Sequence, residues 1–199
     1  LENLATLNST NISELRVLEL ACGSGRLTVP LSMAGHHVLA TDIDPQALEH
    51  LAARLAQHTR AAERIELHTA DMTRFSFKES FKAVCLSTSS ITQLAPEERR
   101  RVLELAAGHL ALGGILIVCT EYLLTDAPAT VSYTPGRHIH LEDRVYQDRR
   151  QVTLTWGEER YTSMLFVIPP AWISRTCKEL GLTVTYRHSR PDPALPGRA

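Results

Sequence analysis

Two glycines separated by one residue, Gly23 and Gly25, follow directly after an apolar run in this 199-residue chain. A glycine turn at the carboxyl end of a strand lets a ligand approach the backbone, because no side chain stands in the way. The helix that follows offers unpaired amides and the positive end of its dipole to a negative group. An ordinary tight turn has the same glycines, so the turn alone is a weak signal of a binding site.

The residues around the turn exclude two common phosphate-binding motifs. A dinucleotide fingerprint would have a third glycine where Thr28 stands, and it does not require an acid within the strand, as at Glu19. A phosphate-binding loop would need Gly-Lys-Ser/Thr, which is absent. Because Glu19 lies among apolar residues, it needs a partner, and we expect the amides of the turn to supply it.

Two further acids follow the next apolar runs: Asp42 comes after residues 37–41 and Asp71 after residues 64–68. A carboxylate after a second strand is suited to accept from both hydroxyls of a ribose. One after a third strand is suited to accept from the exocyclic amine of adenine. Each acid alone could be a loop or cap residue, but the carboxyl ends of parallel strands converge on one crevice. Their joint placement favours a site.

At this point the sequence resembles the class I S-adenosylmethionine (SAM)-dependent methyltransferases. Those enzymes have an acidic-x-Gly-x-Gly-type first motif, an acid after the second strand, and an acid with an apolar residue after the third. The resemblance covers residues 15–121 and extends more loosely to residue 187. It implies SAM as methyl donor and S-adenosylhomocysteine (SAH) as product. The cofactor-binding residues that it implies are Glu19, Ala21, Cys22, Gly23, Gly25, Asp42, Ile43, Asp71, Met72, Leu86 and Ser87.

The resemblance also implies where each part of the cofactor binds. The ribose would bind Asp42. The adenine ring would lie between Ile43 and Met72, with its amine at Asp71. The methionine end would meet the amides of residues 21–23 and the carbonyls of residues 86–87.

The elements that position these residues follow a β-α-β rhythm. The rhythm predicts an α/β fold, a Rossmann-like, doubly wound and mostly parallel sheet with an appended antiparallel segment. Expected strands are residues 16–20, 37–41, 64–68, 81–87 and 114–119. Four helices are expected: one that ends near Ala34, one that begins at Asp44 and Pro45, one from Pro96 to the pair Gly113 and Gly114, and one from Pro169 and Pro170 to Gly181. A final strand is expected at 182–187.

Beyond Glu121 the pattern changes to a period of two. It predicts an antiparallel hairpin formed by residues 151–156 and 161–168. The charged residues nearby, which we expect to form a solvated face, are Asp143, Arg144, Asp148, Arg149 and Arg150. The expected division is a lead-in over 1–14, a SAM-binding core over 15–121, appended substrate-side strands over 122–168, a last helix and strand over 169–189, and a proline-rich tail over 190–199. We also expect Leu1 not to be the native start, and residues 1–14 to be an incomplete lid.

The segment of residues 86–94, after the fourth strand, is similar to the Ser-x-Asn-Ser-Leu-Asn-His-Leu-like stretch of small-molecule N-methyltransferases. It differs from the Asn/Asp-Pro-Pro-Tyr sequence of DNA-adenine and protein-glutamine methyltransferases. We therefore expect methyl transfer to an amine of a small natural product or short, modified peptide. An O-methyltransferase acting on a hydroxylated metabolite and a non-catalytic SAM-binding subunit remain the alternatives.

Three residues of the appended segment are candidates for a general base or a substrate contact: His138, His140 and Tyr133. The His-x-His spacing also fits two ligands of a metal. We expect no metal, because no third ligand is evident and Arg137 would repel a cation.

The charge balance limits the partners. The chain has 21 Lys and Arg against 22 Asp and Glu, a formal net charge of -1, and no basic run for a nucleic-acid backbone or an anionic membrane. No apolar stretch reaches the roughly 18 residues of a membrane span. We expect a cytoplasmic protein whose partner is a small molecule or short peptide. The sequence does not indicate an oligomeric state.

Overall fold

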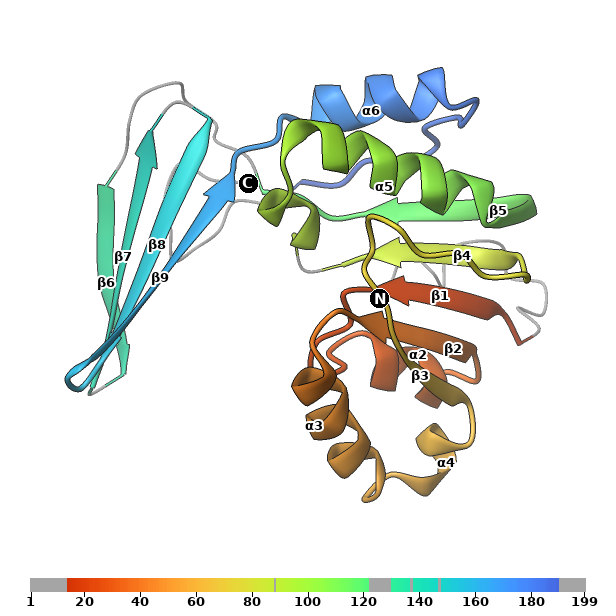
Figure 1. Cartoon of the computed structure of the whole chain (residues 1–199), viewed down its shortest axis with the longest axis horizontal. Helices are drawn as coiled ribbons and strands as arrows, with labels where there is room; N and C mark the ends of the chain where they lie inside the picture. Colours follow the sequence, from red (N-terminus) through yellow and green to blue (C-terminus); the bar gives the residue numbers. More distant parts are fainter. Residues whose placement is uncertain (1–13, 88, 122–129, 137, 147, 190–199) are drawn as a thin grey trace. The chain divides into compact units, whose positions relative to one another are not determined.

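The computed structural model describes residues 14–87, 89–121, 130–136, 138–146 and 148–189 (Figure 1). The chain forms two compact units. The first unit comprises Leu1–Ser87 and Leu105–Val118, and the second comprises Thr88–Glu104 and Cys119–Ala199. Each unit is built around its own sheet.

The sheet of the first unit has five parallel strands in the order β3-β2-β1-β4-β5. The strands are β1 (Arg16–Leu20), β2 (His37–Asp42), β3 (Ile65–Thr69), β4 (Phe81–Leu86) and β5 (Leu110–Val118). Chain order and spatial order reverse between β1 and β4, which is the topological switch point of a doubly wound sheet. The predicted α/β, Rossmann-like fold is confirmed.

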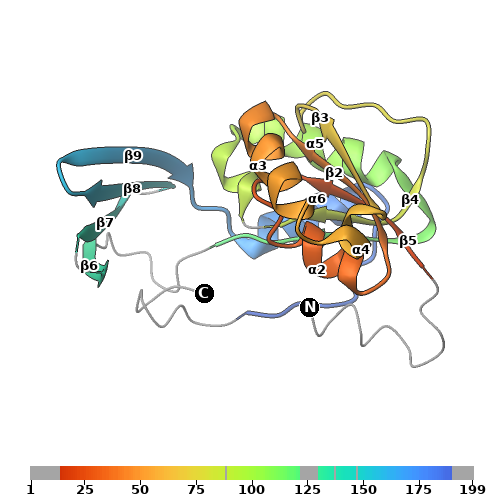
Figure 2. The same ribbon diagram turned by 90° about the horizontal axis from the view of Figure 1, so that it is seen from below.

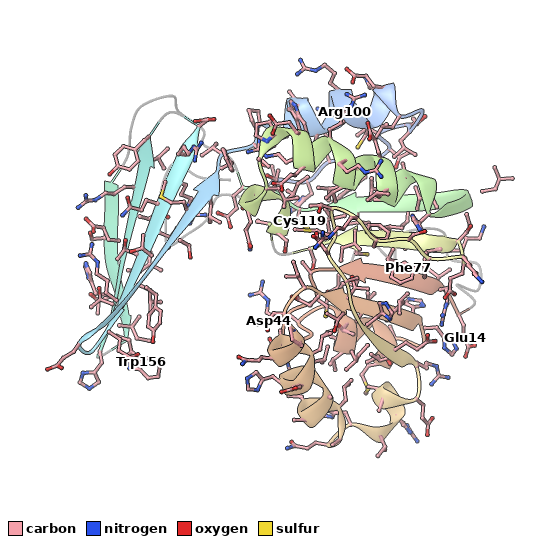
Figure 3. The ribbon with its side chains drawn as sticks, viewed as in Figure 1. Glu14, Asp44, Phe77, Arg100, Cys119 and Trp156 are labelled. Carbon is pink, nitrogen blue, oxygen red and sulfur yellow. The ribbon has the colours of Figure 1, made fainter. Side chains whose placement is uncertain are left out.

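Three helices of the first unit share one core with the sheet. They are α2 (Thr28–Met33), α3 (Pro45–Leu55) and α4 (Thr59–Ala62). The helix α3 begins as predicted, because Asp44 caps it by accepting from the Gln46 amide at 2.9 Å (Figure 3). Its buried residues Leu48, Leu51 and Leu55 join the core cluster. Burying each leucine contributes about 1.5–3 kcal/mol. This burial fixes the start of α3 beside the glycine turn.

The boundary between α5 (Pro96–Gly108) and β5 differs from the prediction. The helix ends five residues before Gly113, and β5 begins at Leu110 rather than Gly114. The glycines are required inside the strand: Gly113 has φ 70, and a Cβ on Gly114 would lie 2.8 Å from the Ala111 carbonyl oxygen. The pairing with β4 shifts register here. The glycine pair therefore marks an irregularity in an edge strand and not the end of a helix.

The sheet of the second unit has four antiparallel strands in the order β6-β7-β8-β9, which Figure 2 shows side by side. They are β6 (Thr130–Gly136), β7 (Ile139–Tyr146), β8 (Arg149–Trp156) and β9 (Glu159–Phe166). The predicted hairpin is confirmed as β8 and β9, closed at Gly157 with φ 62. The strands β6 and β7 lie within residues 122–168, where appended strands were predicted, but the bounds of these two strands were not predicted.

The second unit also contains the 3-10 helix η1 (Ser90–Gln93) and the helix α6 (Pro170–Glu179). The predicted helix is confirmed, and Gly181 follows it with φ 79. The predicted strand at 182–187 is wrong, because residues 182–189 are not paired in any sheet. An alternating pattern shows that a segment suits an extended backbone, but it does not supply a partner strand. No helix in the described part of the chain is long and apolar enough to cross a membrane.

Candidate functional site

The glycine turn after β1 has an unusual backbone. Ala21, Gly23 and Gly25 have φ values of 56, 52 and 80. Among the described residues outside glycine, only Ala21 and Ser89 have a positive φ. A residue with a Cβ is strained in this region, and such strain is concentrated at functional sites. The turn is therefore held in a specific shape by its surroundings.

The two glycines of the turn are needed for different reasons. A Cβ on Gly25 would lie 2.4 Å from Cδ1 of Leu51 in α3, so Gly25 allows the helix to pack against the turn. Among the described residues, apart from Gly23 itself and its two chain neighbours, no atom lies within 4 Å of the position of a Cβ on Gly23. The space beside Gly23 is open, which is what the close approach of a ligand to the backbone requires.

Asp42 at the end of β2 holds this turn. Its Oδ2 accepts from the Gly23 amide at 2.7 Å, and its Oδ1 accepts from the Asp44 amide at 3.0 Å. Each carboxylate oxygen can accept a further hydrogen bond, so both remain able to receive ribose hydroxyls. The Gly23 amide already donates to Asp42. If it also meets the methionine end of the cofactor, as expected from the sequence, its hydrogen atom must be shared between Asp42 and the cofactor.

Glu19, the acid of the first motif, is buried, with 1% of its surface exposed. Its partners are hydroxyls rather than the expected amides of the turn: Thr28 Oγ1 donates at 2.6 Å and Ser87 Oγ at 3.3 Å. Burial raises the pKa of the Glu19 carboxyl to about 7, the two hydroxyls oppose the shift, and the Asp42 charge adds to it. Glu19 therefore links the first helix to the loop after β4.

Asp71 follows β3 and organises its own turn. Its Oδ1 accepts from the backbone amide of Thr73 at 2.9 Å and from the Thr73 hydroxyl at 2.7 Å, and Oδ2 pairs with Arg74 at 3.0 Å. The Thr73 amide and hydroxyl, more than the Arg74 charge, lower the pKa of Asp71 below its usual value. An ionised, partly exposed carboxylate at this position is suited to accept from an amine.

The remaining predicted cofactor residues differ in exposure. Ile43 is 64% exposed, Met72 is half-buried, and Leu86, Ser87 and Cys22 are buried. Burial raises the pKa of the Cys22 thiol to about 12, with smaller contributions from the Glu19 and Asp42 charges. Cys22 is therefore a neutral thiol and not a nucleophile.

The comparisons with known proteins agree with this geometry. Residues 17–114, about half of the chain, match the protein family described as "Methyltransferase domain". An uncharacterized protein of Mycobacterium tuberculosis is 42% identical over 162 residues, which are 76% of this chain and 52% of that protein. The ribosomal protein L11 methyltransferase of Hahella chejuensis is 36% identical over 115 residues, 57% of this chain and 38% of that enzyme. The chain thus spans about half or less of the length of these relatives.

Two solved structures resemble most of the chain. The glycopeptide N-methyltransferase MtfA in complex with SAH has a TM-score of 0.67 and 26% identity, covering 93% of this chain and 76% of that chain. SAM-bound CalS10, an amino pentose methyltransferase from Micromonospora echinaspora, has a TM-score of 0.68 and 17% identity, covering 85% of this chain and 75% of that chain. Residues 17–114 are a class I, SAM-dependent methyltransferase domain.

The methyltransferase domain brings its predicted SAM residues to one edge of the sheet. Leu20 is paired with both Thr41 and Leu86, and Asp42 with Thr69, so the carboxyl ends of four strands are aligned. SAM is the cofactor of this domain, and the open space beside Gly23 fits it. The individual contacts with the ribose, the adenine and the methionine end stay predictions.

The candidate bases lie elsewhere, in the second unit. His138 and His140 are exposed, and the Gly157 amide donates to the His138 carbonyl oxygen at 3.2 Å, at the same end of the sheet as Trp156 (Figure 3). Tyr146 lies at the opposite end of β7, about 20 Å along the strand from His140, because a strand rises by about 3.3 Å per residue. The side chain of Tyr133 lies outside the described residues. Within the described ranges, no three His, Cys, Asp or Glu side chains gather as a possible metal site.

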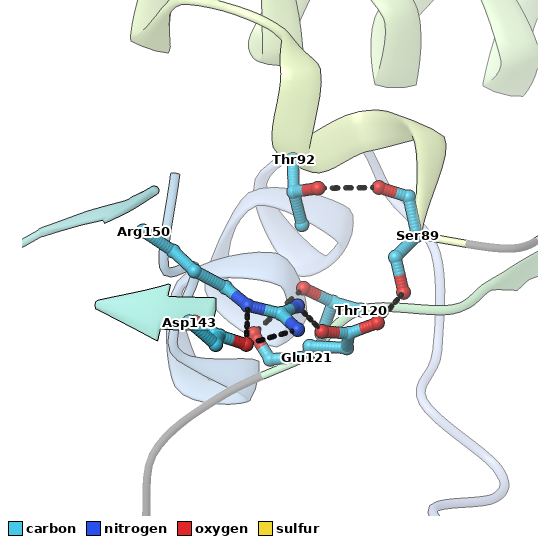
Figure 4. A network of polar contacts seen from close by, with 6 residues as sticks. All are labelled: Ser89, Thr92, Thr120, Glu121, Asp143 and Arg150. Carbon is cyan, nitrogen blue, oxygen red and sulfur yellow. Dashed lines mark hydrogen bonds and ion pairs between the residues drawn. The ribbon is translucent and has the colours of Figure 1, made fainter. Parts of the chain in front are cut away.

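A polar network that was not predicted from the sequence lies toward the Tyr146 end of β7 (Figure 4). The expected solvated face is wrong for two of its residues, because Asp143 is 0% exposed and the Arg150 side chain only 13%. Asp143 is paired with Val152 in the sheet and so lies on its apolar face. The alternation of Ile139, Leu141, Asp143 and Val145 was the signal that could have placed it there.

Proposed function

We propose that the protein transfers the methyl group of SAM to an amine of a small natural product or short peptide. The observation that carries this proposal is the extent of the likeness to MtfA. It covers 93% of the chain and therefore reaches beyond the methyltransferase domain into the antiparallel sheet and α6. MtfA is a glycopeptide N-methyltransferase, and CalS10 is an amino pentose methyltransferase.

The chemistry suits a site without a strong base. The lone pair of a neutral amine attacks the methyl carbon, the carbon–sulfur bond breaks with its electrons on sulfur, and the nitrogen then releases a proton. The amine needs only to be deprotonated before attack, so water or a weak base suffices. Most of the rate enhancement then comes from positioning the amine and the methyl group in line.

The chain's own residues supply the cofactor half of this positioning. Asp42 and Asp71 present carboxylates at the ends of β2 and β3, and the backbone beside Gly23 is open to a ligand. Asp42 is fixed by two backbone amides, so it does not have to be reoriented when a ribose binds. The acceptor half lies outside these residues, in loops and strands whose chemistry follows no family motif.

The proposal is tested with the purified protein, SAM and short synthetic peptides that carry a free amino terminus. A matched set carries the same sequences with an acetylated amino terminus, and a methyl glycoside of an amino pentose serves as the sugar probe. We expect mass gains in units of one methyl group on free amines only. Fragmentation then locates the methyl group on nitrogen.

Two outcomes contradict the proposal and distinguish its alternatives. Methyl gain restricted to hydroxylated compounds would identify an O-methyltransferase. Calorimetric binding of SAM without methyl gain on any of the probes would favour the non-catalytic SAM-binding subunit.

A further inference from the structure

A polar network in the second unit joins four segments that are far apart in the sequence (Figure 4). Ser89 precedes η1, Glu121 follows β5, Asp143 lies on β7 and Arg150 on β8. Arg150 donates from Nε and Nη2 to Oδ2 of Asp143 at 2.9 and 2.7 Å, and from Nη1 to Oε2 of Glu121. Ser89 Oγ donates to Oε1 of Glu121 at 3.4 Å. The Arg150 guanidinium thus connects the sheet to Glu121, and the Glu121 carboxylate connects to Ser89.

The burial of the three charged side chains decreases along the network. Asp143 is fully buried, Arg150 is 13% exposed and Glu121 is 49% exposed. A buried carboxylate requires a charged partner, so Asp143 fixes the orientation of the guanidinium. Arg150 in turn presents Nη1 to Glu121 in a fixed direction. Glu121 is therefore a half-exposed carboxylate whose position is set from inside the sheet.

The residue that Glu121 contacts is strained. Ser89 has φ 61 and ψ 20, a left-handed conformation that costs free energy for a residue with a Cβ. Its carbonyl oxygen accepts from the amide of Thr92 at 2.9 Å and from the Thr92 hydroxyl at 2.7 Å. Its hydroxyl donates to Glu121. The Ser89 backbone is therefore held by hydrogen bonds from Thr92 of η1, and the Ser89 side chain is held by Glu121.

We propose that Glu121 and Arg150 are positioning residues for methyl transfer, which hold the Ser89 turn and η1 in the shape that the acceptor requires. Ser89 is two residues after Ser87, whose hydroxyl donates to Glu19 of the cofactor site. The Ser89 turn therefore follows, in the sequence, the residue that contacts Glu19. The inference rests on the proposed function, because it assumes that an acceptor is methylated.

Three variants separate positioning from direct catalysis. Glu121→Ala removes the acceptor of both hydrogen bonds and leaves Arg150 paired with the buried Asp143. Glu121→Gln keeps an oxygen that accepts from Arg150 and has an amide NH2 group that can donate to the Ser89 hydroxyl, but it cannot take up a proton. Glu142→Gln is the matched control, because Glu142 lies on the same strand as Asp143 and accepts from Arg144 at 2.8 Å instead of from Ser89 or Arg150.

The readouts are kcat and the KM for the best-methylated peptide, together with the Kd for SAM from calorimetry. For Glu121→Ala we expect kcat/KM to fall by about tenfold or more, since a small misplacement of reacting atoms is costly, while the Kd for SAM is unchanged. Glu121→Gln retains most of the activity, and Glu142→Gln behaves as the wild type. If Glu121→Gln is as inactive as Glu121→Ala, the carboxylate takes part in the reaction directly and positioning is wrong. Unaltered kinetics in Glu121→Ala also overturn it.

A second measurement needs no acceptor and keeps this inference apart from the proposed function. Hydrogen exchange of the Thr92 and Leu94 amides reports the stability of the turn and η1. We expect faster exchange in Glu121→Ala and, to a smaller extent, in Ser89→Ala, with Glu142→Gln unchanged. If the wild type methylates no probe, the proposed function fails on that result. If exchange at Thr92 does not change in Glu121→Ala, the network does not hold the turn and the inference fails.

Discussion

The amide of Gly23 donates to Asp42 over 2.7 Å, so the carboxylate at the end of β2 fixes the glycine turn before a cofactor binds. The other oxygen of Asp42 accepts from the amide of Asp44, at the start of α3. One side chain thus joins the turn after β1 to the helix after β2. This arrangement pre-organises two segments beside the predicted SAM site, which lowers the ordering cost of binding.

Substitution of Asp42 separates this role from simple helix capping. We expect Asp42→Ala to weaken SAM binding by about 1.5–3 kcal/mol, because a hydrogen bond to a charged group is lost. The matched variant is Asp44→Ala, which removes the cap of α3 and costs about 1 kcal/mol of stability. Calorimetry with SAM should show a weaker Kd in Asp42→Ala and an unchanged Kd in Asp44→Ala. Equal effects of the two variants would mean that Asp42 acts only on the fold.

The two glycines of the turn predict different costs of substitution. In Gly25→Ala the new Cβ meets Leu51 at 2.4 Å, so overpacking of about 1–3 kcal/mol adds to the strain of a positive φ. In Gly23→Ala only the backbone strain of about 1–2 kcal/mol applies, because the surrounding space is open. Urea denaturation should therefore rank Gly25→Ala as the less stable variant.

The cause of the larger effect is checked by a double-mutant cycle. Leu51→Ala alone leaves a cavity in the core, but in the Gly25→Ala background it also removes the clash. We expect the double variant to be more stable than the sum of the two single effects. Strict additivity would show that Leu51 does not oppose a Cβ at residue 25.

The cofactor half of the molecule was readable from sequence because its signals are local. These signals are the apolar run before Gly23, the Asp-Pro start of α3, and the acids at the ends of β2 and β3. Each is recognised from residues close to it in the chain. Even there, the partners of Glu19 were not readable. Thr28 and Ser87 reach it across 9 and 68 residues, and only the sheet pairing brings the second one close.

The antiparallel sheet was harder to predict from the sequence because its side-chain contacts depend on strand register. Asp143 and Arg150 looked like members of a solvated charged face, but β7 and β8 pair so that both lie on the apolar side of the sheet. The segment at 182–187 alternates like a strand and has no partner in the described part of the chain. Strand pairing depends on residues far apart in the sequence. An alternating pattern therefore predicts which residues share a face of a strand, but not which strand pairs with it or what buries that face.

The hydroxyl of Thr28 tests how the buried Glu19 is stabilised. At pH 8, Thr28→Val removes the donor at 2.6 Å from a buried carboxylate, and we expect a loss of about 1.5–3 kcal/mol in the free energy of unfolding. The matched control is Ser32→Ala, since the buried Ser32 hydroxyl donates to the neutral carbonyl of Ala61 at 2.7 Å. Its loss should cost about 0.5–1.5 kcal/mol. A larger effect at Ser32 would contradict a charged Glu19 at this pH.

Glu19 also predicts a pH dependence of stability. Its pKa is about 7 in the folded protein against 4.5 for the unperturbed group, so between these values the folded state binds more protons. The free energy of unfolding should therefore fall as pH rises from 4.5 to 7, by about 3 kcal/mol from this group, and then level off. In Glu19→Gln this contribution is absent. The difference in stability between wild type and Glu19→Gln, measured by urea denaturation without SAM at pH 5, 6, 7 and 8, isolates it from other titrating groups. A difference that stays constant across these pH values would show that burial does not raise the pKa of Glu19.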